Sequence, residues 1–99
     1  MDWIYNADVS VGNNAVVDLF GQTVSDTLDE DLTPAYSIKL QNTGGTDLYV
    51  GAESGSLSSV GWIVPVDGTL DFDFPSRRRI YATFGSGHTG SVRVLIILK

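Results

Sequence analysis

The sequence YSIKLQNTGGTDLYVGA, residues 36–52, alternates apolar and polar side chains on both sides of a glycine turn. Every second residue from Tyr36 to Leu40 is apolar, and the same alternation returns at Leu48 and Val50. In a β-strand such residues lie on one face of the sheet, and a glycine turn between two such runs is typical of a hairpin. We therefore expect two antiparallel strands here, joined as a hairpin.

Similar short runs recur wherever the chain is divided at its turn residues. They contain Val9 and Val11; Ala15, Val17 and Leu19 after a turn at Asn13 and Asn14; residues 62–65; Leu70, Phe72 and Phe74; residues 79–84; and residues 92–98. About eight short strands separated by turns are typical of an antiparallel sandwich or a jelly-roll-like barrel. The sequence thus predicts an all-β fold, a jelly-roll-like antiparallel β-sandwich, in a single domain over residues 1–99.

Residues 21–35 depart from this alternation and are strongly acidic between positions 26 and 31. Thr27 and Glu30 have the spacing of a helix capping box, and Pro34 would prevent a longer helix. We expect a long acidic loop with at most one helical turn. The loop lacks the D-x-[DN]-x-[DN]-G pattern of calcium sites, so we interpret it as solvated rather than as a cation site.

The last expected strand includes VLIIL, residues 94–98, which is apolar on both faces. One face can join the core, but in a thin sandwich the other face would normally meet water. The sequence leaves two alternatives open. Either the N-terminal segment with Trp3, Ile4 and Tyr5 covers this face, or a neighbouring subunit does.

Composition limits the classes of partner. The chain has 99 residues, a formal net charge of −6 and no cysteine. A domain this small without disulfides depends on its core or on partner subunits for stability. The negative charge opposes binding to nucleic acid or to anionic lipid, and the N-terminal residues MDWIYNADVS contain no apolar run of the length of a signal peptide or membrane span. We expect neither a nucleic-acid nor a membrane partner.

Residues 85–90, GSGHTG, match the spacing G-x-G-x-x-G of dinucleotide-binding loops. In such a loop the glycines open a helix, whereas here the β-rich residues 91–99 follow. The motif therefore predicts a hairpin connection between two strands, in which glycine supplies the positive φ that the turn requires.

Candidate catalytic residues do not form a recognisable site. Ser86 and His88 lie at the tip of the expected turn, where an oriented triad with an oxyanion hole is not available. Asp71 and Asp73 could be read as a carboxylate pair for glycoside cleavage, but their spacing places both on one polar strand face, and we interpret them as solubilising charges. With one histidine and no cysteine, a zinc site would need several carboxylates, and no ligand spacing suggests one. We expect no enzyme, and no catalytic, cofactor-binding or metal-binding residues.

The segment SRRR, Ser76 to Arg79, holds three of the six Lys and Arg residues of this acidic chain. One interpretation is a contact with an acidic patch on a neighbouring protein, for example the 26–31 loop of another copy. The other is a turn whose charges pair locally with Asp71 or Asp73 across strands. The sequence does not distinguish the two.

Four strings in the chain, NTGGTDLYVG, VPVDGTL, IYATFGSG and SVRVL, resemble in their order a pattern found in small virion proteins of tailed bacteriophages. The resemblance lies between residues 37 and 98 and covers about two thirds of the chain. It implies a β-sandwich on the capsid surface, acting as a decoration (cement) protein, or else a part of the head-to-tail or tail structure. It further implies assembly as an oligomer, often a trimer, on the major capsid protein of a virion, after synthesis in the host cytoplasm.

The resemblance supplies no catalytic residue, and neither the acidic loop nor SRRR belongs to the matched strings. For contacts with the capsid or with other subunits we select aromatic residues as buried anchors and arginines as charge-pairing groups. The selected contact residues are Trp3, Tyr5, Arg77, Arg78 and Arg79.

The alternative function is a carbohydrate-binding or receptor-binding module of a phage tail or head fibre, in which Trp62, Tyr49 and Tyr81 would stack on sugars. Such a site requires exposed aromatic rings beside polar side chains on one surface. Burial of Trp62 and Tyr81 in the core would discard it. An enzyme would require a pocket that brings Asp71, Asp73 or His88 together.

Overall fold

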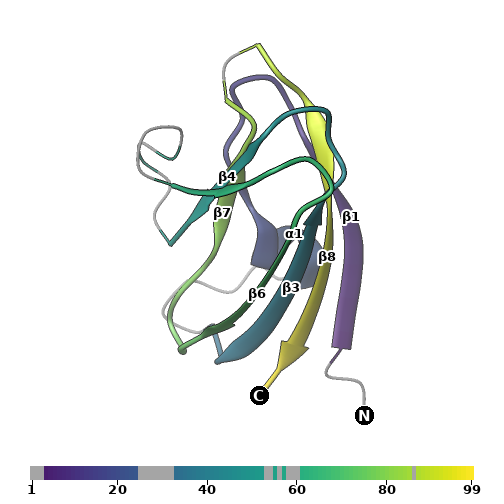
Figure 1. Cartoon of the computed structure of the whole chain (residues 1–99). Helices are drawn as coiled ribbons and strands as arrows, with labels where there is room; N and C mark the ends of the chain where they lie inside the picture. Colours follow the sequence, from purple (N-terminus) through teal and green to yellow (C-terminus); the bar gives the residue numbers. More distant parts are fainter. Residues whose placement is uncertain (1–3, 25–32, 53–54, 56, 58–60, 86) are drawn as a thin grey trace.

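Two antiparallel sheets pack face to face in the computed structural model (Figure 1), which describes residues 4–24, 33–52, 55, 57, 61–85 and 87–99. In this part of the chain each sheet has four strands, with one short helix between them at one side. The elements are β1 (Ile4–Val11), β2 (Val17–Asp18), α1 (Leu19–Val24), β3 (Tyr36–Asn42), β4 (Leu48–Gly51), β5 (Trp62–Val64), β6 (Thr69–Phe74), β7 (Tyr81–Thr83) and β8 (Gly90–Leu98).

The strand order is that of a jelly roll. One sheet has the order β1-β8-β3-β6 and the other β2-β7-β4-β5. Strands 1 and 8, 2 and 7, 3 and 6, and 4 and 5 are antiparallel partners, so the chain resembles one long hairpin that is folded over itself into two sheets. The prediction of an all-β, antiparallel sandwich is confirmed.

The two predicted hairpins are wrong. β3 and β4 belong to different sheets, as do β7 and β8, so both glycine-rich segments carry the chain from one sheet to the other. At the first crossing the buried side chain of Asn42 holds the turn, because its Nδ2 donates to the carbonyls of Thr46 and Val64 at 2.8 and 2.9 Å while its Oδ1 accepts from Gly44 N at 2.9 Å. At the second crossing the expected positive φ is present, at 89° for Gly85 and 83° for Gly87.

The core lies between the sheets and follows the predicted alternation. Tyr36, Ile38 and Leu40 of β3 are at most 2% exposed. The ring of Phe84, which is also buried, fits between two glycines. A Cβ atom on Gly44 would lie 2.7 Å from this ring, and one on Gly90 would lie 2.9 Å from it, so both positions require the absence of a side chain.

The helix α1 closes one side of the sandwich. It contacts β1 and β8 of one sheet and β2 and β7 of the other, and its Leu19 and Phe20 are fully buried. Asp18 caps the helix, because its Oδ1 accepts a hydrogen bond from Gly21 N at 3.0 Å. Leu19, predicted to be in a strand, is therefore the first residue of a helix. The expected capping box and the acidic residues 26–31 lie outside the described residues.

Candidate functional site

Among the residues that the structure describes, no helix covers the side of the sandwich opposite α1. This side lies between the edge strands β5 and β6, each of which pairs with one neighbour among the described strands. A groove of about 380 Å³ runs between them. We call it the edge groove. Its lining is almost entirely apolar and includes one arginine. The lining includes Val50, Trp62, Leu70, Phe72, Phe74 and Arg78.

Two aromatic residues of the edge groove are unusually exposed. Trp62 is 70% exposed and Phe72 is 54% exposed. Both occupy inward-facing positions, since Trp62 lies opposite Val50 and Phe72 opposite Ile38, and these two partners are each 2% exposed. On an edge strand an inward-facing side chain has no further strand beside it. Residues with the character of core residues therefore meet solvent here.

A row of aromatic rings connects the edge groove with the core. The ring centroids of Phe20 and Tyr36 are 4.6 Å apart, those of Tyr36 and Phe74 are 5.4 Å apart, and those of Phe74 and Phe72 are 5.3 Å apart. Such spacings are favourable for aromatic pairs. The row starts at the fully buried Phe20 and Tyr36 and ends at the exposed Phe72, which fixes the position of the exposed ring.

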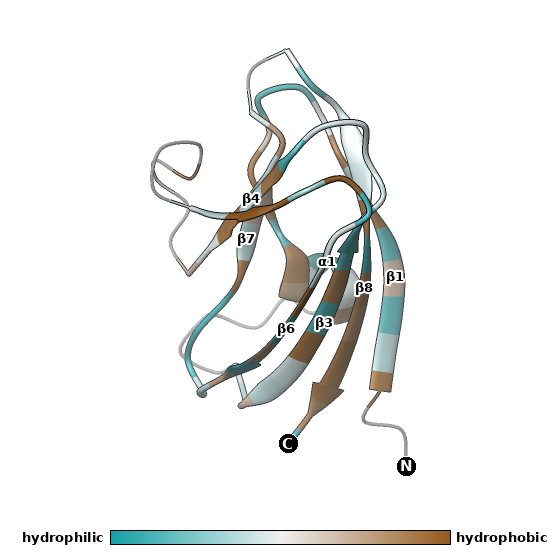
Figure 2. Ribbon diagram, viewed as in Figure 1, coloured by the Kyte–Doolittle hydropathy of each residue, from teal (hydrophilic) through white to brown (hydrophobic). Residues whose placement is uncertain are grey.

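The outer face of β8 carries a second apolar surface, which we call the β8 patch. Figure 2 shows the C-terminal half of β8 as continuously hydrophobic. Ile97 is 41% exposed and lies opposite Ile4, which is 59% exposed, while Leu95 beside them is half-buried. Ile4 therefore extends this face rather than covering it. Tyr5 lies opposite the buried Ile96, on the other face of the sheet, and Trp3 lies outside the described residues.

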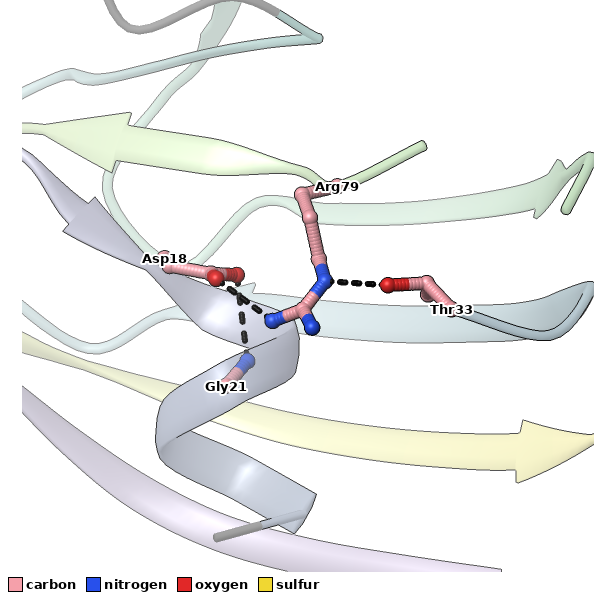
Figure 3. A network of polar contacts seen from close by, with 4 residues as sticks. All are labelled: Asp18, Gly21, Thr33 and Arg79. Atoms are coloured by element: carbon pink, nitrogen blue, oxygen red, sulfur yellow. Dashed lines mark hydrogen bonds and ion pairs between the residues drawn. The ribbon is translucent and has the colours of Figure 1, made fainter. Parts of the chain in front are cut away.

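Arg79 is a structural residue, which corrects its selection as a contact residue. Its side chain is buried, its Nη1 lies 2.7 Å from Asp18 Oδ2, and its Nε donates to Thr33 Oγ1 at 2.6 Å (Figure 3). The guanidinium also lies 4.7 Å from the centre of the Phe20 ring. Local pairing of Arg79 with Asp71 or Asp73 is likewise not observed, because its carboxylate partner is Asp18 on β2.

The three arginines of SRRR lie in different environments. Arg77 is exposed, has a φ of 68°, and donates its backbone N–H to the Thr33 carbonyl at 2.8 Å. Arg78 is exposed and lines the edge groove. Since Arg79 is buried, two of the three charges are available to a partner, and one of these borders the apolar groove.

Beyond the β8 patch, the outer face of the first sheet is polar, and its charged residues lie opposite residues of the other sign. Asp8 lies opposite Arg93, and Lys39 lies opposite Asp71. These residues line a wide, open hollow of about 600 Å³. In each pair, residues of opposite charge lie on neighbouring strands, as expected of a solvated sheet face.

Asp73, on the same face, is stabilised as a carboxylate. Ser37 Oγ donates to Asp73 Oδ1 at 2.6 Å, and Lys99 Nζ lies 3.2 Å from the same oxygen. The hydrogen bond from Ser37 and the bond and charge of Lys99 lower the pKa of Asp73 below its ordinary value.

Asp71 and Asp73 line one open hollow on the outer face of the first sheet, and His88 does not belong to its lining. His88 is exposed in the segment between β7 and β8. Ser86 lies outside the described residues. Over the ranges that the structure describes, no three His, Cys, Asp or Glu side chains are close enough to hold a metal ion.

The aromatic residues considered for sugar stacking lie on two different faces. Trp62 is opposite the inward-facing Val50, whereas Tyr49 is opposite Ile63 and therefore points to the outer face of the second sheet. Tyr81 lies opposite Gly51 and shares that outer face with Tyr49. Both tyrosines are half-buried. Trp62 is exposed, so the condition that would discard sugar binding is not met, but the three rings do not form one platform.

Comparisons with known proteins find a similar fold but no matching family. No protein-family model matches the chain. No curated protein matches it either. The chain is similar to a solved structure of Bacillus endospore appendages, described as a novel family of disulfide-linked pili, with 13% identity, a TM-score of 0.53, and coverage of 97% of this chain and 89% of that one. At this identity the likeness shows a shared fold alone. In the described part of the chain, no helix has the length and apolar character to cross a membrane.

Proposed function

We propose that this chain is a structural protein of a tailed-bacteriophage virion, most specifically a capsid decoration (cement) protein. In this proposal it binds the outer surface of the head, contacts the major capsid protein, and assembles as a homotrimer. Many copies on one particle would each contribute a small interface, and the array would stabilise the shell.

The observation that carries the proposal is the edge groove with its exposed Trp62 and Phe72. Exposed aromatic side chains that become buried in a complex often contribute most of the binding free energy of a protein interface. Of the selected arginines, Arg78 lines this groove and Arg77 is exposed nearby in sequence, so both can pair with acidic groups of a partner. The β8 patch offers a second apolar surface, suited to contacts between subunits.

The structural neighbour shares the fold of this chain. Its description concerns pili, which are assemblies of many subunits. This chain contains no cysteine, so an assembly built from it could not be linked by disulfides. Its contacts would depend on apolar surfaces and charge pairs.

A carbohydrate-binding or receptor-binding module is less well supported. A sugar site needs hydrogen-bonding side chains beside its aromatic ring, and the edge groove offers one charged side chain, Arg78, in a lining that is otherwise apolar. The exposed Trp62 alone favours this alternative.

The test is binding of the purified chain to empty, expanded phage capsids, followed by measurement of their resistance to heat. We expect binding, a higher capsid melting temperature, and a trimer in size-exclusion chromatography with light scattering. Trp62→Ala should weaken capsid binding about tenfold or more, as for a residue at the centre of an interface.

The matched control is Ile63→Ala, because Ile63 is 54% exposed on the same strand but faces the other way. It should leave capsid binding unchanged. Ile97→Ser should weaken the trimer while the monomer stays folded. A chain that binds no capsid but binds glycans on an array would replace the proposal with the carbohydrate-binding alternative.

A further inference from the structure

The edge strand β6 has the features of an acceptor for an additional strand. Within the described structure it pairs with β3 and has no strand on its other side. Along such an edge, backbone N–H and C=O groups point outward and remain available to another extended chain. Four of its six residues are exposed. A strand of similar length could therefore pair with β6.

The edge groove lies directly beside this free edge. A strand added to β6 would place every second side chain on the inward side, next to Leu70, Phe72 and Phe74. Apolar side chains at those positions would fill the groove and cover Phe72 and Trp62. The backbone edge and the apolar groove thus favour one and the same ligand, an extended segment with alternating apolar residues.

The charges on β6 favour particular residues at the outward-facing positions of an added strand, which alternate with its apolar positions. On the outer face β6 carries Asp71, which has Lys39 on its β3 side, and Asp73, whose side chain is 75% exposed despite its contact with Lys99. Outward-facing side chains of an added strand would lie next to these carboxylates. Lysine or arginine at those positions is favoured, and acidic residues are opposed.

The described edge strands of a second copy do not supply such a segment. Antiparallel pairing of two β6 strands about Phe72 would place Asp71 of each copy opposite Asp73 of the other. The other described edge strands, β1, β2 and β5, have the sequences IYNADVSV, VD and WIV and contain no lysine or arginine. We therefore assign the segment to a different protein.

We infer that the free edge of β6 and the edge groove together bind an extended segment of another protein, in which apolar residues alternate with lysine or arginine. This inference rests on the proposed function for the biological source of the segment, which would be the surface that the chain decorates. The binding chemistry itself follows from the backbone edge, the groove and the two aspartates.

The test uses a soluble peptide of about eight residues that alternates lysine with valine or leucine. An alternating glutamate peptide and a peptide with the same lysines and apolar residues in blocks serve as controls. Binding to the full chain is measured by NMR titration, and hydrogen exchange of the β6 amides is measured with and without peptide. Of the three peptides, we expect only the alternating lysine peptide to bind. Its binding should slow the hydrogen exchange of the β6 amides that point away from β3.

Substitutions separate the groove from the charges. Trp62→Ala should weaken peptide binding about tenfold, while Ile63→Ala leaves it unchanged. Asp71→Asn combined with Asp73→Asn should weaken it about threefold or more at low salt and reduce its dependence on salt. Equal binding of the glutamate peptide, or binding without protection of the β6 amides, would overturn the inference.

Comparing capsid binding with peptide binding tests this inference separately from the proposed function. If capsids bind the chain through Trp62 but the peptide does not, the proposed function stands and strand addition is wrong. If the peptide binds with β6 protection but capsids do not, strand addition stands and the segment belongs to another partner.

Discussion

Replacing Arg79 with methionine is predicted to destabilise the protein strongly. The substitution removes the ion pair with Asp18 at 2.7 Å, the hydrogen bond to Thr33 at 2.6 Å and the stacking over Phe20. A hydrogen bond to a charged group contributes about 1.5–3 kcal/mol, and a desolvated cation–π contact contributes about 2 kcal/mol. The side chain of Asp18 is 31% exposed, so it regains some hydration when its partner is lost. We expect the free energy of unfolding to fall by about 3 kcal/mol, because such contributions are not additive.

The assay is urea unfolding followed by circular dichroism, with thermal unfolding as a second measurement. A loss of about 3 kcal/mol corresponds to a melting temperature lower by about 12–24 °C for a domain of this size. Arg77→Met is the matched control, since Arg77 is exposed, and it should change the unfolding free energy by less than about 0.5 kcal/mol. Combining Arg79→Met with Asp18→Asn should recover part of the loss, because asparagine still caps α1 and leaves no unpaired carboxylate. Equal effects of Arg79→Met and Arg77→Met would refute the structural role of Arg79.

Three further outcomes are expected. Burial, together with the nearby Asp18 carboxylate, raises the pKa of Tyr36 above its ordinary value of 10.0, so the unfolded chain loses this proton first and stability falls as the pH rises beyond about 10. Tyr36→Phe should remove that part of the alkaline decline in urea titrations. Gly44→Ala should lower stability by about 1–3 kcal/mol, because its Cβ would lie 2.7 Å from the buried Phe84 ring, and a melting temperature equal to that of the wild type would contradict this packing. Ser37→Ala should raise the pKa of Asp73 toward its ordinary value in an NMR titration, because the hydrogen bond at 2.6 Å is its largest source of stabilisation.

Local alternation predicted the strands and their buried faces but could not predict their partners. Tyr36, Ile38 and Leu40 face the core as their spacing indicated. The same spacing arises whether the next strand lies in the same sheet or in the opposite one, and a glycine turn serves both connections. For this reason the sequence predicts hairpins after β3 and after β7, although each of these segments crosses between sheets.

Predicting the candidate site requires the order of the strands in each sheet, and short-range sequence patterns do not contain this order. Phe72 and Trp62 look like ordinary core residues of their strands, and only the positions of β5 and β6 at the edges make them exposed. The role of Arg79 was equally hidden, because its partner Asp18 is 61 positions away in the sequence and the neighbouring arginines have the same chemistry. No spacing rule separates a buried arginine from an exposed one in a run of three.

The aromatic row from Phe20 to Phe72 has a practical consequence for finding the natural partner. A molecule that covers Phe72 would extend the packed interior by one more layer, so occupancy of the site and resistance to unfolding would rise together. A partner held at 100 times its dissociation constant stabilises the folded state by about 2.7 kcal/mol, which a dye-based melting screen detects easily. Candidate partners could therefore be ranked by their effect on melting before their binding is measured directly.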